Sequence, residues 1–271
     1  LDNDFIAKRG KIDFSVLSLE SISKWSNERV NVIQKIHPLF LNELDSTKSL
    51  SLFNEIEMPL LKVLCKMEIE GINLDVDLLN KYSEELKLEL EENCQKIYKL
   101  SNTKFNISSP KQMGEVLFEK MNLVKKPKKT KSGQYSTSEE TLLKLKGKHE
   151  IIDYILDFRE IKKLISTYVD ALPEIVDPQT KRIHTTFNQS VASTGRLSSV
   201  RPNLQNIPIR TARGMKIREA FISSQDRLLM AADYSQIELR IMASLSKDRG
   251  MLDAFNNGID IHSATAAKVY K

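Results

Sequence analysis

The feature that most constrains the fold of this 271-residue chain is a long stretch without glycine or proline, from Asp75 to Ser101. Leucine and isoleucine recur in it at helical spacing, with Glu and Lys residues between them, which is the pattern of an amphipathic α-helix. Either Asp75 or Asp77 can cap its N-terminus. At about 1.5 Å per residue this helix is roughly 35–40 Å long, so the sequence predicts a helix that projects from a more compact body. Because the heptads are irregular, a coiled-coil arm is the less favoured alternative.

Composition places the chain among globular proteins, since 41% of its residues are hydrophobic and 28% are charged. No apolar run approaches the roughly 20 residues of a transmembrane helix, and the N-terminus lacks the basic-then-apolar order of a signal peptide. We therefore expect no membrane partner and a cytoplasmic (bacterial) or organelle-matrix location. Cys65 and Cys94 lie far apart, which supports neither a disulfide framework nor a zinc site. The chain does not begin with Met and ends within a helical pattern, so we expect a fragment.

Positive charge is concentrated in two parts of the sequence. The formal net charge is +5, yet the basic stretch from Lys181 to Arg218 contains no Asp or Glu. A second cluster, Lys125 to Lys131, surrounds Pro127 and has no acidic residue before Glu139. Such a distribution favours a polyanionic partner that is bound through its phosphates. A solvated basic face is the alternative.

Two further helices are predicted beside these basic residues. Ser109 precedes Pro110 and an apolar helical pattern, which indicates a helix N-terminus. Its exposed N–H groups, together with Lys111, can bind phosphate, although a purely structural cap is the alternative. Residues 153–168 predict another helix, in which Arg159, Lys162 and Lys163 lie within about one turn.

Short strands are predicted at three places. Residues 53–70 predict a helix, and 71–75 a turn with a short extended piece. Alternating apolar residues predict strands over 182–188 and 228–232. The last of these is followed by Asp233 and by a helical pattern, so a carboxylate would stand at a strand terminus. That position suits a hard cation such as Mg²⁺, and a helix N-cap is the alternative.

Several segments carry a resemblance to one family. The motifs are Thr194-Gly195-Arg196-Leu197-Ser198-Ser199 with Pro202-Asn203-Leu204-Gln205-Asn206-Ile207-Pro208, then Asp233-Tyr234-Ser235-Gln236-Ile237-Glu238-Leu239-Arg240, then Asp260-Ile261-His262 with Ala264-Thr265-Ala266-Ala267. The second resembles motif A of the family A DNA polymerases, and the others resemble the signature just upstream and the opening of the fingers domain just downstream. Residues 106–112 and 159–168 resemble the thumb motif and DNA-backbone helix of that family. The resemblance thus covers almost the whole chain.

This resemblance implies an α+β fold of right-hand polymerase architecture, with a largely helical thumb, part of an antiparallel palm sheet and the start of helical fingers. It divides the chain into the tail of a 3′–5′ exonuclease-like domain (1–40), palm base and thumb (41–180), the first half of the palm with motif A (181–250) and the start of the fingers (251–271). The implied activity is template-directed DNA synthesis in replication or repair. The enzyme would transfer a nucleotide from a dNTP to a primer 3′-hydroxyl, act as a monomer on a primer–template duplex, and use two Mg²⁺ ions.

The resemblance also implies residue roles. Asp233 would be the catalytic carboxylate and a metal ligand, with the Tyr234 carbonyl as a further ligand. The dNTP would be bound by Tyr234, Ser235, Gln236, Ile237 and Glu238 of motif A, and by His262 and Arg210. The bulk of Glu238 would exclude a ribose 2′-hydroxyl. Phosphate contacts would come from Ser108, Ser109, Lys111, Arg159 and Lys163. Contacts in the minor groove, where acceptors occur at similar places in every base pair, would come from Asn188, Thr194, Arg196, Asn203, Gln205 and Asn206.

Two departures from the family pattern limit these expectations. The second metal carboxylate of the family belongs to a His-Asp-Glu motif that this sequence does not contain, so the isolated chain is expected not to polymerise. The exonuclease pattern aligns with Trp25 to Arg29 and places a cation where a metal-binding Asp is expected, which argues against proofreading. A non-catalytic duplex-binding fragment is the main alternative function, and a nuclease remnant is a weaker one.

Overall fold

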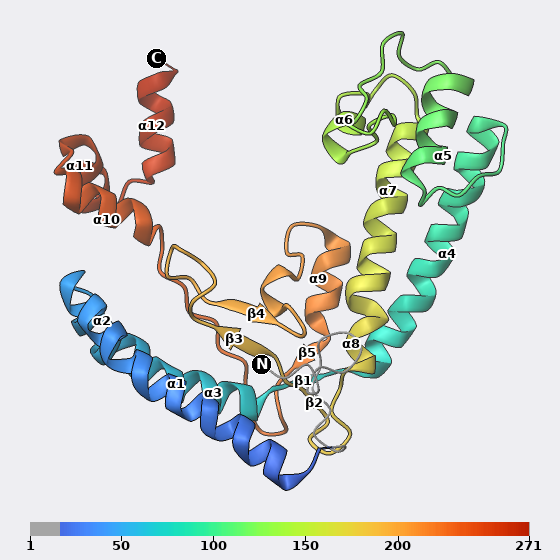
Figure 1. Cartoon of the computed structure of the whole chain (residues 1–271). Coiled ribbons are helices and arrows are strands. Elements are labelled where there is room, and N and C mark those ends of the chain that lie inside the picture. The colour runs from blue at the N-terminus through green and yellow to red at the C-terminus, as the bar shows by residue number, and fades with distance from the viewer. Residues whose placement is uncertain (1–16, 271) are drawn as a thin grey trace. The chain divides into compact units, whose positions relative to one another are not determined.

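The computed structural model describes residues 17–270 and forms two compact units, Leu1–Ile222 and Ser223–Lys271 (Figure 1). Residues 1–16, which belong to the predicted exonuclease-like tail, lie outside the described residues. The division between the units does not coincide with the predicted boundaries at 180 and 250, and that domain division stays a prediction. In the part of the chain that the structure describes, no helix is long and apolar enough to cross a membrane.

The N-terminal part of the first unit is helical. Helix α1 (Leu19–Ser46) begins at the capping residue Ser18 and continues through residue 40, where the sequence predicts a domain boundary. Within it the Arg29 guanidinium lies 3.3 Å from the centre of the Trp25 ring. Helix α2 (Leu50–Leu52), the π-helical segment η3 (Phe53–Glu57) and α3 (Met58–Glu70) follow. The predicted helix over 53–70 is confirmed, with one π turn at its start.

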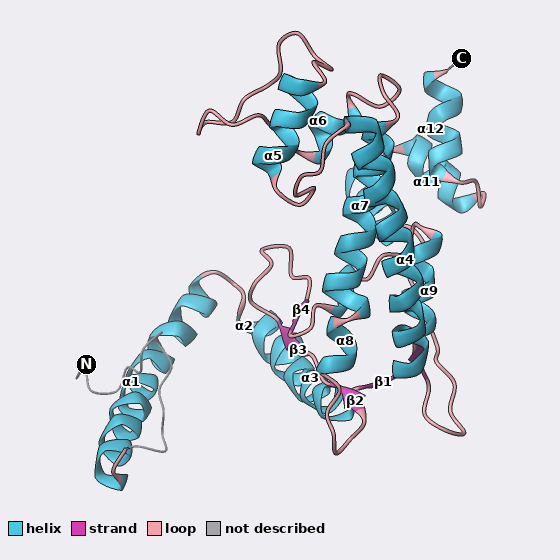
Figure 2. Ribbon diagram, turned by 90° about the vertical axis from the view of Figure 1, so that its right-hand side faces the viewer, coloured by secondary structure: helices cyan, strands magenta, loops and turns pink. Residues whose placement is uncertain are grey.

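Two long helices pack side by side in this unit. Helix α4 (Val76–Ser101) lies along α7 (Ile151–Leu164) (Figures 1 and 2). The predicted long helix is confirmed. Asp75 is its N-cap, because its carboxylate accepts a hydrogen bond of 2.9 Å from the Leu78 N–H.

Each end of the α4–α7 pair has its own hydrophobic core. One core joins the helices to the sheet and includes Leu79, Leu86, Ile161, Ile183 and Ile217. The other lies at the far end, where α5 (Pro110–Glu115), η4 (Val116–Lys120) and α6 (Glu139–Leu143) cover the pair. Leu90 packs against both cores. The pair therefore connects a sheet-bearing base to a separate helical tip, and the turn η5 (Ile165–Val169) and α8 (Ala171–Glu174) complete the base.

The sheets are small and antiparallel. Strand β1 (Ile72–Leu74) lies between β2 (Arg182–Ile183) and β5 (Phe221–Ile222), with Ile72 opposite Ile183 and Leu74 opposite Phe221. Strand β3 (Thr186–Asn188) pairs with β4 (Ser198–Val200). The short 3₁₀ helix η6 (Leu204–Asn206) and α9 (Ala212–Glu219) connect β4 to β5.

The strand predicted over 182–188 is wrong as one element, because it is divided between two sheets at His184 and Thr185. The His184 ring nitrogens lie 2.8 Å from the Glu68 carbonyl oxygen and 2.7 Å from the Thr180 hydroxyl. The buried Thr185 hydroxyl bonds to Ser199 and Pro202. These side chains hold the backbone to α3 on one side and to the β4–η6 turn on the other, so the strand cannot continue through them.

Gly71 marks the entry into β1. Its φ is +62°, and a Cβ atom there would lie 2.7 Å from both the Ile183 carbonyl oxygen and the His184 ring. Only glycine fits both the backbone conformation and the space. The turn predicted at this position is therefore specific to glycine.

The second unit consists of α10 (Ile237–Ser246), α11 (Arg249–Asn256) and α12 (Ile261–Val269). The strand predicted over 228–232 is wrong, because the structure has no strand there. A strand is stabilised by backbone hydrogen bonds to a neighbour, and among residues 17–270 none pairs with this segment. The side chains are accordingly open to solvent, with Leu228 95% and Met230 90% exposed.

Candidate nucleic-acid interface

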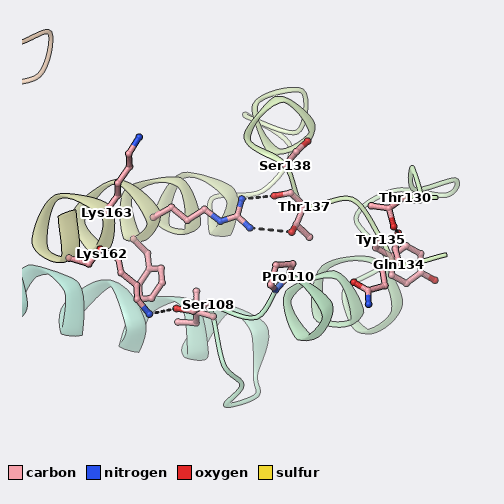
Figure 3. Close-up of a pocket in the computed structure, with 13 residues that line it drawn as sticks. Ser108, Pro110, Thr130, Gln134, Tyr135, Thr137, Ser138, Lys162 and Lys163 are labelled. Atoms are coloured by element: carbon pink, nitrogen blue, oxygen red, sulfur yellow. Dashed lines mark hydrogen bonds between the residues drawn. The ribbon is translucent and has the colours of Figure 1, made fainter. Parts of the chain in front are cut away.

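A cavity of about 610 Å³ lies between the start of α5 and the C-terminal half of α7 (Figure 3). Its rim carries hydroxyl groups from Ser108 and Ser138 and basic groups from Arg159, Lys162 and Lys163. Hydroxyl and amino donors without any carboxylate in the lining suit a phosphate group. We refer to it as the α5–α7 cavity.

Helix α5 is positioned by the predicted cap. The Ser109 hydroxyl accepts a hydrogen bond from the Gln112 N–H at 3.4 Å, and Pro110 occupies the first turn. Ser108 lies beside this cap, and its hydroxyl is bonded to the Lys162 amino group. The exposed side chain of Lys111 lies on α5 but does not line the cavity. Lys162, which was not among the predicted contacts, is therefore the residue that joins α7 to the thumb-motif segment.

Lys162 and Lys163 leave α7 in different directions, as Figure 3 shows. Lys163 is exposed on the rim of the cavity. Arg159 is half-buried and directed inward, where its guanidinium donates to the carbonyl oxygen of Thr137 and, at 3.2 Å, to the Thr137 hydroxyl. Burial lowers the pKa of this guanidinium. Of the basic residues predicted on α7, Lys163 is thus exposed to solvent, whereas Arg159 is hydrogen-bonded to Thr137.

The predicted minor-groove residues gather on the β3–β4 hairpin and on η6. Asn188 ends β3 opposite Ser198, and Thr194 and Arg196 lie exposed in the connecting loop. Asn203 and Asn206 are also exposed, beside the return from β4. The structure therefore brings together, in one local substructure, residues that are 18 positions apart in the sequence.

Two of these residues also hold the substructure together. The Gln205 side chain accepts from the Ser199 N–H at 3.1 Å and donates to the Leu197 carbonyl oxygen at 3.1 Å. The Asn203 side chain accepts from the Gln205 N–H at 3.1 Å. Sequence alone could not show the Gln205 side-chain bonds, because they depend on how η6 folds back on β4.

Several basic residues of the stretch from Lys181 to Arg218 form ion pairs with acidic residues of α3, α4 and α7. Arg182 pairs with Glu70 of α3, and Lys216 pairs with Glu85 of α4. Arg213 pairs with Asp157 and, at 2.9 Å, with Glu89. The exposed arginines of the stretch are Arg196, Arg201, Arg210 and Arg218. Part of the charge that the sequence assigned to a polyanion is therefore used inside the fold.

The motif A segment lies in the second unit. Asp233, Tyr234 and Ser235 are exposed, and Gln236 has left-handed backbone geometry with φ 53° immediately before α10. Because α10 begins at Ile237 after this residue, Asp233 is not the N-cap of the helix. Glu238 lies in the first turn of α10. The alternative interpretation of Asp233 as a helix cap is therefore wrong.

A hydrogen-bond network joins the starts of α10 and α12. The Gln236 amide donates to Asp260 at 2.8 Å, and Asp260 also accepts from the N–H and the hydroxyl of Ser263. These bonds, with the Ser263 N–H contributing most, lower the pKa of Asp260. His262 follows in the first turn of α12. Asp260, which was not among the predicted site residues, thus links the segment that carries Gln236 to the one that carries His262.

The donors available to a cation in this segment are the Asp233 carboxylate and backbone carbonyls such as that of Tyr234. Oxygen donors of this kind fit Mg²⁺. Among the described residues, no three His, Cys, Asp or Glu side chains gather as a metal site. The donor set is therefore of the right chemistry but supplies one carboxylate.

Comparison with known proteins agrees with this arrangement. Residues 76–271 match the model of DNA polymerase family A. DNA polymerase I of Bacillus subtilis (strain 168) is 48% identical over 257 residues, covering 94% of this chain and 29% of its own length. DNA polymerase I of Synechocystis sp. is 52% identical over 230 residues, covering 84% of this chain and 23% of its own length. The chain thus spans less than a third of these relatives.

A solved structure shows the same fold. The POL domain of Pol1 from M. smegmatis, in complex with DNA primer-template and dNTP, superposes with a TM-score of 0.77 at 42% identity. The match covers 85% of this chain and 40% of that one. The expected α+β fold class is confirmed by this neighbour and by the small antiparallel sheets among helices. The chain belongs to DNA polymerase family A.

Proposed function

We propose that this chain forms the thumb and the first part of the palm of an enzyme that carries out template-directed DNA synthesis. The observation that carries the proposal is the family match over residues 76–271, which includes the whole motif A segment. The similar Pol1 structure was solved with DNA primer-template and dNTP, which supports the same partners here. The reaction is transfer of a nucleotide from a dNTP to the primer 3′-hydroxyl with release of pyrophosphate.

Motif A would provide the catalytic carboxylate. Asp233 and the Tyr234 carbonyl would hold Mg²⁺, which when bound lowers the pKa of a hydroxyl and stabilises charge on a transferring phosphoryl group. Exposure of Asp233 on the segment before α10 supports this role. Ser235 to Glu238, with His262 and Arg210, would contact the nucleotide. Glu238 would reject a ribose 2′-hydroxyl by its bulk.

The first unit would grip the duplex. Phosphates at the α5–α7 cavity and on α5 would be bound by Ser108, Ser109, Lys111 and Lys163. The exposure of Ser108, Lys111 and Lys163 supports such contacts. The minor groove would be contacted by residues of the β3–β4 hairpin and of η6: Asn188, Thr194, Arg196, Asn203, Gln205 and Asn206. Because purine N3 and pyrimidine O2 acceptors occupy similar places in every pair, these contacts would favour correct pairing without selecting a sequence.

The isolated chain is proposed to be inactive. Two-metal catalysis needs further carboxylates, and the motif A segment supplies Asp233. The relatives are more than three times as long as the matched region, so the remaining groups would come from outside these residues. One copy of the complete enzyme would suffice, because both DNA-gripping surfaces lie in a single chain.

Primer extension by the full-length protein tests the proposal. Asp233→Asn should lower the synthesis rate by about 10²–10³-fold, the range seen when one electrostatic stabiliser is lost. The matched control is Asp253→Asn, an exposed carboxylate on α11 of the same unit, which should retain the wild-type rate. Glu238→Ala should retain synthesis and increase ribonucleotide incorporation. Synthesis that survives in the Asp233 variant would refute the assignment.

The second candidate function is non-catalytic duplex binding, favoured by the basic α5–α7 cavity. Both hypotheses predict salt-sensitive binding of duplex DNA. They differ in the full-length protein, where duplex binding without any Asp233-dependent synthesis would select the non-catalytic function. Metal-dependent loss of primer 3′ nucleotides would instead revive the nuclease remnant.

A further inference from the structure

We propose that Arg159 is a positioning residue that fixes the basic hairpin Lys128–Ser136 to α7, rather than a direct phosphate ligand. The inference deepens the proposed function, on which its relevance to DNA rests. It reverses the role that the sequence suggests for Arg159.

Both terminal nitrogens of the Arg159 guanidinium donate to protein acceptors. One nitrogen donates to the Thr137 carbonyl oxygen, and the other lies 3.2 Å from the Thr137 hydroxyl and 3.1 Å from the Met113 sulfur. Thr137 and Met113 are themselves buried, with exposed fractions of 5% and 0%. The planar fork of arginine suits this two-point contact with Thr137. A phosphate would have to displace buried partners to reach these same N–H groups.

Thr137 is the residue through which the hairpin returns to the helical tip. The hairpin is closed by hydrogen bonds from the Ser136 N–H to the Lys128 carbonyl at 2.8 Å and from the Thr130 N–H to the Gln134 carbonyl at 2.7 Å. Directly after Thr137, Ser138 caps α6 by accepting from the Thr141 N–H. Arg159 therefore holds Thr137, the residue that directly follows the hairpin and precedes the cap of α6 (Figure 3).

A second attachment of the hairpin uses packing. Tyr135 stacks near Phe118, with ring centroids 5.5 Å apart. A Cβ atom on Gly114 would lie 2.8 Å from the Tyr135 Cβ, so the hairpin closely approaches α5. The apolar contact orients one face of the hairpin, and the Arg159 fork fixes its end.

The position of the hairpin decides where its charge lies. Lys128, Lys129 and Lys131 belong to it, and the Lys129 amino group lies 5.0 Å from the centre of the Tyr135 ring. With a fixed end, these lysines are held beside Thr130 and Tyr135 of the same hairpin, which line the α5–α7 cavity. Without it, the same charges would be spread over many loop conformations, and ordering them on DNA would cost entropy.

Amide hydrogen exchange of the full-length protein without DNA tests the inference. In Arg159→Lys, the amides of Thr130 and Ser136 should exchange about tenfold faster, because a single ammonium cannot reproduce the fork, while the amides of α4 keep their protection. Thr137→Val removes one acceptor and should produce a smaller acceleration at the same amides. The control Lys163→Ala, on the same helix, should leave hairpin exchange unchanged while it weakens duplex binding.

The inference would be overturned if the amides of Thr130 and Ser136 exchanged at the wild-type rate in both Arg159→Lys and Thr137→Val. It would also be overturned if Lys163→Ala accelerated their exchange as much as Arg159→Lys does. If Arg159→Lys also loses α4 protection, the Thr137→Val result decides. Failure of the wild-type protein to bind duplex would refute the proposed function alone, since the exchange measurement contains no DNA.

Discussion

Arg213 stabilises the base of the long helix pair from a position that sequence analysis could read only as a basic residue. Its guanidinium joins α9 to Asp157 on α7 and to Glu89 on α4. The Asp157 side chain is 34% exposed, so removal of its partner leaves a partly buried charge. We expect Arg213→Ala to lower the free energy of unfolding by about 1–3 kcal/mol.

Urea unfolding of the variant measures this loss. The exposed pair Lys144–Glu140, in which both side chains are 72% exposed, is the control. Lys144→Ala should change the free energy of unfolding by less than about 0.5 kcal/mol. Equal effects of the two substitutions would show that Arg213 acts as an ordinary surface charge.

Tyr82 makes stability depend on alkaline pH. Burial, followed by the charge of Glu89, raises the pKa of Tyr82 to about 12, compared with about 10 in an unfolded chain. The folded state therefore holds this proton more tightly, and the stabilisation is complete below pH 10 and is lost as the pH rises from 10 to 12. Tyr82→Phe should reduce the fall in unfolding free energy between pH 9 and 11, as measured by urea titrations. Parallel curves for the two proteins would contradict this.

Helix α4 depends on its first turn, and the structure selects between two candidate caps. Asp75 accepts the hydrogen bond from Leu78, whereas Asp77 lies exposed in the first turn. Asp75→Ala should cost about 1 kcal/mol of unfolding free energy, and Asp75→Asn should cost much less. Asp77→Ala, which loses only a helix-dipole interaction, should cost a few tenths. A larger loss in the Asp77 variant would reverse the assignment.

At the scale of elements, sequence predicted what depends on local pattern. The α4 pattern and the Ser109–Pro110 helix start are encoded within one or two turns, and both are confirmed. The strand predicted over 182–188 is divided into β2 and β3, and the strand predicted over 228–232 is absent, because strand extent depends on a neighbour. The side chains of His184 and Thr185 form hydrogen bonds with residues far away in the sequence or in the other strand. Within residues 17–270, no strand pairs with residues 228–232.

In the candidate site, too, sequence predicted features that are encoded locally and missed features that depend on tertiary contacts. Motif A could be identified because the residues that carry the resemblance, Asp233 to Arg240, are consecutive in the sequence. The internal roles of Arg159 and Gln205 could not, since their partners Thr137 and Leu197 are set by tertiary structure. The predicted DNA contact of Gln205 stays a prediction, whereas the predicted phosphate contact of Arg159 is replaced by the proposed positioning role.

For the whole molecule, duplex binding should be dominated by counterion release. Lys111 and Lys163 are exposed and proposed to contact phosphates, so each substitution by alanine should reduce the slope of log K against log salt concentration by about 0.9. The effect should be the same on duplexes of unrelated sequence, because phosphate contacts carry no base information. Fluorescence anisotropy of the full-length protein over a salt series measures it, with Lys144→Ala as the control. A loss confined to one DNA sequence would argue against phosphate contact.

The separation of the two hydrophobic cores has a mechanical consequence. The 26 residues of α4 make an arm of about 39 Å at about 1.5 Å per residue. With such leverage, a rotation of about 10° at the base would carry the tip through about 7 Å, or about two 3.4 Å steps along a duplex strand. If the tip binds DNA as proposed, angular stiffness around Leu79 and Ile217 would set how accurately it registers with the phosphates.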